Sequence, residues 1–280
     1  MQNFICLKYS FAFFFLFEIG GNKMPYFVVT GASSGIGEAM CEVLAQRGYD
    51  LIMVARRVER LQMLKEKLEQ VYPCHALVLQ CDLSDLNAVK EVYDVCATYD
   101  VAGLINNAGY GLYGEFLTLN IDDEFNLIDL NIKSVQLLTK LFLSDLVKKN
   151  HGYLLNVAST AAFQSGPLMA TYYASKGYVL QLTEALAKEL KEKQSGVVVS
   201  VLCPGPVDTE FQKRAQIKVA KSLFHVPTAQ EVAKEAIDQL LKGKTLIIPG
   251  SSNRLLLFFN RFIPRKLGSH IVYQTQLKKK

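Results

Sequence analysis

A glycine-rich segment near the start of the chain constrains the fold more than any other feature. It reads TGASSGIG over residues 30–37, after the apolar run 26–30 and before an amphipathic stretch at 36–47. The three glycines suit a tight turn out of a strand, a close approach of the backbone to a pyrophosphate, and close packing of helix on strand. The helix N-terminus would then face the anion with free N–H groups. The alternative is an ordinary glycine-rich turn, but the strand–loop–helix context favours a dinucleotide site. We expect it to use Gly31, Ser33, Ser34, Gly35, Ile36 and Gly37.

Short apolar runs alternate with longer helical patterns along most of the chain. Helical patterns cover stretches such as 36–47, 59–71 and 170–193. Several strands are almost wholly apolar, as expected where helices cover both faces of a sheet. This alternation predicts a doubly wound, parallel, Rossmann-type α/β sheet within one domain, residues 24–250, followed by a basic, apolar extension at 251–280. The predicted strands are Tyr26–Thr30, Leu51–Ala55, Ala76–Cys81, Gly103–Asn106, Gly152–Ala158, Val197–Cys203 and Thr245–Pro249.

The charge of the chain is unevenly distributed. Its net charge is +5, from 31 Lys and Arg against 26 Asp and Glu. Residues 239–280 hold nine basic and no acidic side chains, so the first 238 residues carry 22 basic and 26 acidic ones, a balance of −4. A nucleic-acid-binding surface would need basic residues clustered on the folded body. We therefore expect no nucleic-acid partner.

The cysteines indicate neither a metal site nor a disulfide framework. None of them forms a CxxC pair, and the chain has only four histidines. Several lie within apolar runs, where cysteine behaves as a small buried hydrophobe. No apolar run approaches the roughly 18–20 residues that span a bilayer. We expect a cytoplasmic protein with reduced core thiols and no metal. The six are Cys6, Cys41, Cys74, Cys81, Cys96 and Cys203.

The first 23 residues are interpreted as a non-native or disordered extension. The run FAFFFLF at 11–17 is short for a signal peptide, and no A-x-A-like cleavage site follows it. The first strand begins two residues after Met24, as if the domain started there. Codons for Gly20 and Gly21 can spell a purine-rich ribosome-binding element six nucleotides before Met24. We expect Met24, rather than Met1, to be the native start in a bacterial gene.

Two arginines after the second predicted strand bear on the choice of cofactor. An NAD-binding fold usually has an acidic residue there to hold the adenosine ribose, whereas this chain has Arg56 and Arg57. A guanidinium can bind a 2′-phosphate with two hydrogen bonds. The pattern favours NADP over NAD, unless both arginines are solvated surface residues. Asp82, after the third strand, is either an acceptor for the adenine amine or a helix N-cap.

Several short motifs follow one another along residues 24–250. They are TGASSGIG at 30–37, Asp82-Leu83, Asn106-Asn107-Ala108-Gly109, Asn131, Ser159, Tyr172-x-x-x-Lys176 and Pro204-Gly205. Taken together, they resemble the short-chain dehydrogenase/reductase family closely: they occur in the family's order and cover essentially all of residues 24–250. Each motif alone is weak, but the set is specific. The resemblance implies a Rossmann-type fold and nicotinamide-dependent carbonyl–alcohol chemistry.

The residues themselves support acid–base catalysis. Tyr172 and Lys176 are four apart in a helical pattern, so they share a face. A phenol with a pKa near 10 is a poor base, and we expect the Lys176 ammonium to lower the pKa of Tyr172. Tyr172 could then give or take the proton of a substrate hydroxyl, with Ser159 holding the substrate carbonyl. The alternatives are a surface helix pair and a turn serine. Tyr173 lacks such a partner, because Gly177 lies four residues on.

The resemblance assigns further roles. It implies that Asn131 supports a water chain from Lys176, unless it is a solvent-facing helix residue, and that Lys176 also holds the nicotinamide ribose. Asn107 and Gly109 would line the cofactor groove or form a sharp turn, and both readings can hold together. The loop after the sixth strand would contact the nicotinamide amide through Pro204, Gly205, Val207 and Thr209, and lead into a substrate cover at 210–226. We expect His225 to be a surface residue.

The C-terminal extension reads RLLLFFNRFI at 254–263. An apolar face beside cations could lie in a membrane interface, but we favour packing of Leu255–Phe259 over the substrate pocket or a subunit interface. An apolar cover suits a lipophilic ketone or acyl substrate, and the family implies a homodimer or homotetramer. The leading interpretation is an NADP-dependent reductase of a ketone, aldehyde or oxoacyl group. The alternatives are a non-catalytic NADP sensor and a membrane-associated binding protein.

Overall fold

The computed structural model describes residues 24–207, 210 and 226–278. Three predictions lie outside the described residues: the N-terminal extension at 1–23, the contact of Thr209 with the cofactor, and the surface position of His225. Most of the expected substrate cover at 210–226 lies outside them as well.

The described chain forms one seven-stranded parallel sheet in the order β3-β2-β1-β4-β5-β6-β7. Strands β2 and β3 lie on one side of β1, and β4 to β7 lie on the other, so the strand order reverses between β1 and β4. The carboxyl ends of β1 and β4 therefore flank the crevice where such sheets bind ligands. The prediction of a doubly wound α/β sheet is confirmed. The last strand is shorter than predicted, and the others agree to within two residues at each end. The strands are β1 (Tyr26–Thr30), β2 (Asp50–Ala55), β3 (Ala76–Gln80), β4 (Val101–Asn106), β5 (Gly152–Val157), β6 (Val197–Leu202) and β7 (Leu246–Ile247).

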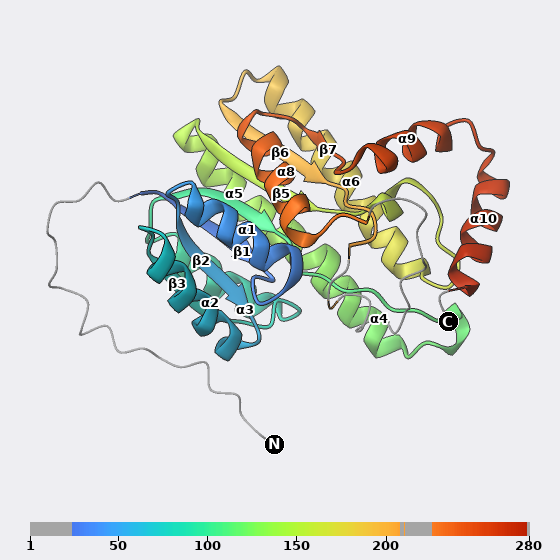
Figure 1. The fold of residues 1–280 in the computed structure, drawn as a ribbon, viewed down its shortest axis with the longest axis horizontal. Helices are drawn as coiled ribbons and strands as arrows, with labels where there is room; N and C mark the ends of the chain where they lie inside the picture. The colour runs from blue at the N-terminus through green and yellow to red at the C-terminus, as the bar shows by residue number, and fades with distance from the viewer. Residues whose placement is uncertain (1–23, 208–209, 211–225, 279–280) are drawn as a thin grey trace, which may run out of the picture.

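Helices cover both faces of the sheet (Figure 1). One face packs against α1 (Gly35–Gln46), α2 (Val58–Val71) and α8 (Ala229–Leu241). The other packs against α3 (Leu86–Cys96), α5 (Val135–Lys149) and α6 (Ala170–Glu192). Because both faces are covered, the central strands are largely apolar, with few buried polar residues among them.

Shorter elements and the C-terminal helices complete the chain. Before α5 come the 3₁₀ turn η1 (Phe116–Thr118), α4 (Ile121–Ile128) and the π-helical turn η2 (Asp129–Ser134). The 3₁₀ turn η3 (Thr160–Phe163) follows β5. The helices α9 (Ser251–Asn260) and α10 (Arg265–Leu277) lie on the side toward which the strand arrows point (Figure 1).

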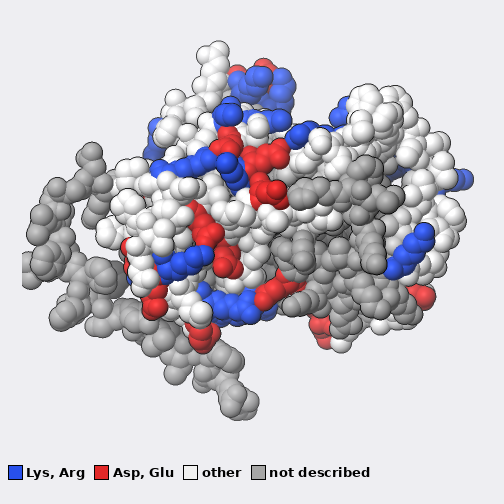
Figure 2. Space-filling model, in the orientation of Figure 1, with Lys and Arg blue, Asp and Glu red and all other residues white. Residues whose placement is uncertain are grey.

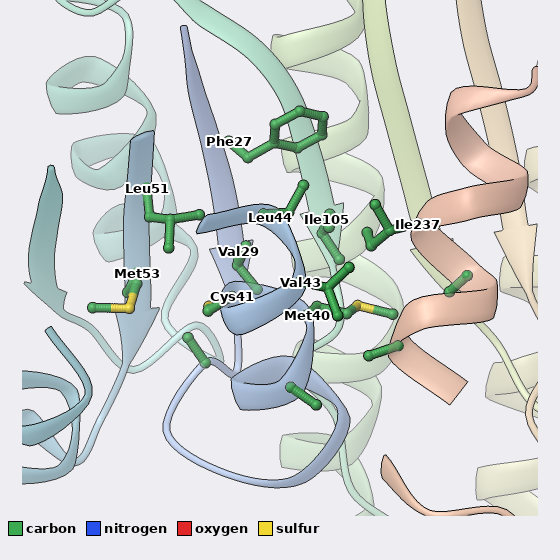
Figure 3. Close-up of a cluster of buried hydrophobic side chains, with 14 of the residues drawn as sticks. Phe27, Val29, Met40, Cys41, Val43, Leu44, Leu51, Met53, Ile105 and Ile237 are labelled. Atoms are coloured by element: carbon green, nitrogen blue, oxygen red, sulfur yellow. The ribbon is translucent and has the colours of Figure 1, made fainter. Parts of the chain in front are cut away.

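The core beneath α1 and α8 is built on the alternation of buried side chains along β1 (Figure 3). Phe27 and Val29, two apart on β1, point to the same face and are fully buried with Leu44 of α1 and Ile237 of α8. Alternate residues of a strand share a face, so the other face of β1 buries Val28 in the second cluster. Each buried Leu, Ile or Phe stabilises the fold by about 1.5–3 kcal/mol.

A buried polar network ties the middle of the sheet to the helices on one face. Asn106 of β4 donates its amide to Asn156 Oδ1 of β5 at 2.9 Å and to Thr139 Oγ1 of α5 at 3.1 Å. Asn156 in turn donates to Thr183 Oγ1 of α6 at 3.0 Å. All four side chains are buried. Because buried polar groups are costly when unpaired, this network fixes how α5 and α6 sit on the sheet.

We predict that Asn156→Ala lowers the free energy of unfolding by about 2–4 kcal/mol, because it removes the three side-chain hydrogen bonds of Asn156 and opens a cavity. Denaturant titration measures the change. Asn87→Ala, on the exposed surface of α3, is the control and should change stability by less than about 0.5 kcal/mol. Equal effects of the two substitutions would contradict the role given to the network.

Candidate active site

Tyr172 and Lys176 lie one turn apart on α6 and are both buried, with exposed fractions of 9% and 6%. The Lys176 Nζ atom lies 5.9 Å from the centre of the Tyr172 ring. It donates a hydrogen bond of 2.8 Å to the carbonyl oxygen of Val157, the last residue of β5. The surface helix pair is therefore excluded, and the two residues are held together at the carboxyl edge of the sheet.

Ser159 joins this pair from the end of β5. Its Oγ accepts from the N–H of Ala161 at 3.1 Å, so it caps the 3₁₀ turn that follows. Its hydroxyl also forms a hydrogen bond with Tyr172. Ser159 is therefore both a turn residue and a site residue, because the cap fixes the position from which its hydroxyl contacts the Tyr172 phenol.

The pKa shifts of Tyr172 and Lys176 differ from those expected from the sequence. Burial raises the pKa of Tyr172 above its ordinary value, and the hydrogen bond from Ser159 only partly offsets this. Burial lowers the pKa of Lys176 to about 8. The prediction that the pKa of Tyr172 is lowered is therefore wrong for the protein chain by itself: loss of hydration dominates, and the group that lowers the pKa is Ser159 rather than Lys176. In this environment Tyr172 is a protonated phenol at neutral pH, which suits a proton donor.

Asn131 is fully buried in η2, so the solvent-facing alternative is excluded. Its Oδ1 accepts from the N–H of Tyr110 at 3.2 Å, and its Nδ2 donates to the Tyr110 carbonyl at 2.9 Å. The same amide donates to Ser175 Oγ at 3.1 Å, and Ser175 donates to the Tyr172 carbonyl at 2.7 Å. Asn131 therefore connects the loop after β4 to the helix that carries Tyr172. The π-helical turn places it there, as such turns often do at functional sites.

Gly109 and Asn107 shape the loop after β4. A Cβ atom on Gly109 would lie 3.0 Å from Asn131 Oδ1 and 3.4 Å from Lys176 Nζ, so a side chain here would press on both residues. Asn107 donates its amide to the Thr30 carbonyl at 3.0 Å, and its N–H to Thr30 Oγ1 at 2.9 Å. Asn107 therefore forms the sharp turn that was one of its two expected roles, and its hydrogen bonds join the ends of β1 and β4.

The loop at 31–37 has the backbone that its glycines predict. Gly31 and Gly35 have φ values of 66° and 60°, in the left-handed region that favours glycine. A Cβ atom on Gly37 would lie 2.4 Å from the Gly31 carbonyl oxygen, so α1 packs closely on the turn. Ser34 occupies the N-cap position but makes no capping hydrogen bond with its side chain. Backbone N–H groups of the first turn of α1 thus have no side-chain cap, as an anion site requires.

A group of polar side chains lies beside this loop. Arg57 donates to Ser34 Oγ at 2.8 Å and to Ser33 Oγ at 3.2 Å. Glu210 accepts from Arg57 at 2.7 Å and from Arg60 at 2.6 Å. Hydrogen bonds from the two guanidinium groups lower the pKa of Glu210 to about 2. The guanidinium groups of Arg57 and Arg60 and the two serine hydroxyls therefore form an anion-binding cluster. The anion bound there is the Glu210 carboxylate of the same chain.

Arg56 and Asp82 form a separate pair. The Arg56 guanidinium lies 3.6 Å from the Asp82 carboxylate. Asp82 also accepts from the N–H and hydroxyl of Ser84. Burial raises the pKa of Asp82, but these hydrogen bonds and Arg56 outweigh it, so the pKa lies below its ordinary value. The N-cap alternative for Asp82 is wrong, because Asp85 caps α3.

The loop after β6 closes another side of the site. The Pro204 carbonyl accepts from the N–H of Thr160 at 2.9 Å, which ties this loop to the turn after Ser159. Val207 is buried. A Cβ atom on Gly205 would lie 2.5 Å from the side chain of Asn253, so the loop contacts the start of α9.

Four residues near the site were not predicted from the sequence. Arg60 follows Arg57 by three residues at the start of α2, so helical spacing could have indicated it. Tyr110 and Ser175 meet Asn131 through tertiary packing, for which the sequence carries no local signal. Gln276 of α10 is buried and donates to the Tyr173 hydroxyl at 2.8 Å. Within the described residues, no group of three or more His, Cys, Asp or Glu side chains could hold a metal ion.

Comparison with known proteins adds to this geometry. Residues 26–220 match the family model described as short chain dehydrogenase. The chain is 31% identical over 218 residues to very-long-chain 3-oxoacyl-CoA reductase-B of Danio rerio, covering 76% of this chain and 68% of that protein. It is 31% identical over 220 residues to human 17-beta-hydroxysteroid dehydrogenase type 3, covering 77% and 68%.

Solved structures agree with the architecture. A short-chain dehydrogenase from Sphingobium yanoikuyae in complex with NADPH is 30% identical, with a TM-score of 0.77. The similarity covers 85% of this chain and 93% of that one.

We predict that Lys176→Met raises the free energy of unfolding at pH 7 by about 1–3 kcal/mol, because the ammonium is buried and no described carboxylate forms an ion pair with it. The pKa of Lys176 falls from 10.5 unfolded to about 8 folded. Between these values the unfolded state binds the proton and the folded state does not, so wild-type stability rises with pH there. The advantage of the variant should therefore be largest below pH 8 and shrink toward pH 10.

Denaturant titrations across this pH range measure the difference. Lys191→Met, an exposed lysine on the same helix, is the control and should show no such pH-dependent gain. A loss of stability in Lys176→Met at every pH would contradict the assigned cost of burial.

Proposed function

The chain belongs to the short-chain dehydrogenase/reductase family of oxidoreductases, and on that premise we propose that it interconverts a carbonyl group and an alcohol using NADP(H). One observation carries the proposal. Tyr172, Ser159, Lys176 and Asn131, which arise from three separate segments, form one connected group at the carboxyl edge of the sheet, in which Ser159 is half-buried and the other three are buried. A module that only binds a nucleotide has no need of a buried phenol beside a buried ammonium.

The residues present fit a dinucleotide. The uncapped first turn of α1 and the left-handed glycines of the loop suit a pyrophosphate. Asn107 and Gly109 would line the groove between β1 and β4. Pro204, Gly205 and Val207 would lie along the nicotinamide, and Lys176 would donate to the nicotinamide ribose. The bound nicotinamide would supply or accept the hydride.

In the proposed reaction, the chain's residues orient the carbonyl and move one proton. The Ser159 hydroxyl donates to the substrate oxygen and holds it beside Tyr172. Tyr172 gives its phenolic proton to the developing alkoxide during reduction and takes it back during oxidation. The Lys176 ammonium, fixed by the Val157 carbonyl, stabilises the phenolate that remains. Asn131 holds the loop after β4 against α6, and a water beside it would return the proton from solvent.

We assign the preference for NADP to the cluster of Arg57, Arg60 and Ser34. The family includes a relative solved with NADPH. Guanidinium and hydroxyl donors match the oxygens of a 2′-phosphate. Glu210 already occupies these donors as a carboxylate, so in the proposal it competes with the phosphate. Arg56, paired with Asp82, lies on the adenine side of the proposed site.

The proposed substrate is a lipophilic ketone, aldehyde or oxoacyl compound. Two similar proteins bear the names of a hydroxysteroid dehydrogenase and a very-long-chain 3-oxoacyl-CoA reductase; a steroid and a very long acyl chain are lipophilic groups. Tyr173 lies beside Tyr172 on α6, and its hydroxyl accepts a hydrogen bond from Gln276 of α10. Tyr113, in the loop after β4, donates to the carbonyl of the same Gln276. Homo-oligomerisation and a cytoplasmic location remain predictions.

We predict that Tyr172→Phe lowers turnover by about 10²–10⁴-fold, because it removes the proton donor. A carbonyl panel followed by NADPH absorbance first identifies a substrate, and calorimetry measures NADPH affinity, which should be unchanged. Tyr178→Phe, whose phenol bonds Gln136 at the surface of the same helix, is the control and should keep its rate. If Tyr172→Phe retained more than about a tenth of the wild-type rate, another acid would have to act.

We predict that the chain binds NADPH more tightly than NADH by about 1–3 kcal/mol, the range for hydrogen bonds to charged groups. Arg57→Ala should remove most of this preference. Glu210→Gln should raise NADPH affinity and leave NADH affinity nearly unchanged, because it removes a negative charge that competes with the phosphate. Glu66→Gln, an exposed carboxylate of α2, is the control. Equal affinities of the wild-type chain for the two cofactors by calorimetry would refute the preference.

A further inference from the structure

The C-terminal helices expose an unusual number of large apolar side chains. Of the run Leu255–Phe259, only Leu257 is buried. Four of the five residues therefore do not pack over the substrate pocket of the same chain, whereas the other expectation, a subunit interface, stays a prediction. We call the exposed set the outer face of α9; its members recur at helical spacing and are 52–72% exposed. They are Leu255, Leu256, Phe258, Phe259 and, in the following turn, Phe262.

The phenylalanines of this face pack on one another rather than on the body. The ring centres of Phe258 and Phe259 are 5.5 Å apart, and those of Phe258 and Phe262 are 5.6 Å apart, both in edge-to-face arrangements. The patch is therefore contiguous, and soluble monomers rarely leave such patches exposed without a binding role. On the side seen in Figure 2, the part of the surface over α9 and α10 is largely without charged side chains.

Three exposed cations flank the same patch. Arg261, Arg265 and Lys266 lie in and after the turn between α9 and α10, and none of them forms an ion pair with a described residue. No Asp or Glu occurs after residue 238. The surface thus joins exposed aromatic rings to exposed positive charge.

The inner side of the two helices is attached to the body. Leu257 and Val272 are buried. The Tyr113 hydroxyl donates to the Gln276 carbonyl at 3.0 Å, and Gln276 donates to Tyr173. Arg254 at the start of α9 is bound to Glu235 of α8. The helices are therefore held in place with the apolar face turned outward.

We propose that the outer face of α9, with Phe262 and the cations Arg261, Arg265 and Lys266, binds the interface of a bilayer that contains anionic lipids. The aromatic rings would enter the boundary between headgroups and acyl chains, and the cations would meet the headgroup phosphates. Within the described residues, no helix is long and apolar enough to cross a membrane, so the contact is interfacial.

The charges favour a lipid surface over a second copy of the chain. In a two-fold dimer the same patch would face itself. The cations of the two copies would then lie near each other, with no acidic residue in the segment 239–280 to pair with them. Like charges brought together across an interface oppose association. An anionic bilayer instead complements both parts of the surface: its headgroups pair with the cations, and its acyl chains receive the aromatic rings.

Co-sedimentation with lipid vesicles tests the proposal on the full chain. Vesicles of phosphatidylcholine with phosphatidylglycerol should bind the wild-type protein, and vesicles of phosphatidylcholine alone should bind at least tenfold less. The double variant Phe258→Ser/Phe259→Ser should lose at least tenfold in binding to the anionic vesicles. The triple variant Arg261→Gln/Arg265→Gln/Lys266→Gln should lose a similar factor together with the salt dependence.

A matched control removes exposed apolar side chains elsewhere. Met63→Ser/Val71→Ser changes two exposed residues of α2 and should bind like the wild type. All proteins keep residues 1–23, so any contribution of that segment is common to them. The substituted side chains are exposed, and the melting temperatures should agree to within a few degrees, which shows that each variant is folded.

Three outcomes would overturn the proposal. The first is wild-type protein that stays in the supernatant with anionic vesicles. The second is a Phe258→Ser/Phe259→Ser variant that binds them as tightly as the wild type. The third is a wild-type dimer that this variant converts to a monomer in sedimentation equilibrium, without any vesicle binding, which would assign the face to a second copy.

Discussion

The hydrogen bond from Lys176 Nζ to the carbonyl oxygen of Val157 holds the candidate site together. It joins the second turn of α6 to the last residue of β5, and both residues are buried. Ser159 follows Val157 by two residues, and Tyr172 precedes Lys176 by one helical turn, so this bond fixes the distance between the two hydroxyls. Gly109 lies against the same ammonium because it has no side chain. Loss of this anchor would free both partners of the proposed proton transfer.

The site is built from groups whose burial is unfavourable, and it lies beside a network of paired polar side chains. Lys176 is a buried cation, and Tyr172 is a buried phenol with a raised pKa. Around them, the network of Asn106, Thr139, Asn156 and Thr183 satisfies the buried amides. The network fixes the positions of α5 and α6 on the sheet, and it thereby supports the helix that carries the buried Lys176 ammonium. Such perturbed pairs in a cleft are characteristic of catalytic positions.

Much of the fold was predictable because its signals are local. The strands are apolar, β-branched runs with helical patterns between them, so their positions followed from periodicity, and the glycines at 31 and 35 have the left-handed backbone expected of them. β7 is shorter than predicted because an apolar run does not show where pairing ends. The direction of the pKa shift of Tyr172 was missed because burial, which dominates it, is a tertiary property. The same holds for Glu210, 150 residues beyond Arg60 in the chain, and for the outward face of α9.

The account stands on hydride transfer to a carbonyl carbon with Tyr172 as the proton donor. The most direct measurement uses NADPH labelled with deuterium on the transferred position, a panel of lipophilic ketones, aldehydes and oxoacyl compounds, and mass spectrometry of the products. The account predicts an alcohol that carries one deuterium on the former carbonyl carbon, formed by the wild-type chain and not by Tyr172→Phe. Tight binding of NADPH with no deuterium in any product across the panel would contradict it and indicate a nucleotide-binding protein without this chemistry.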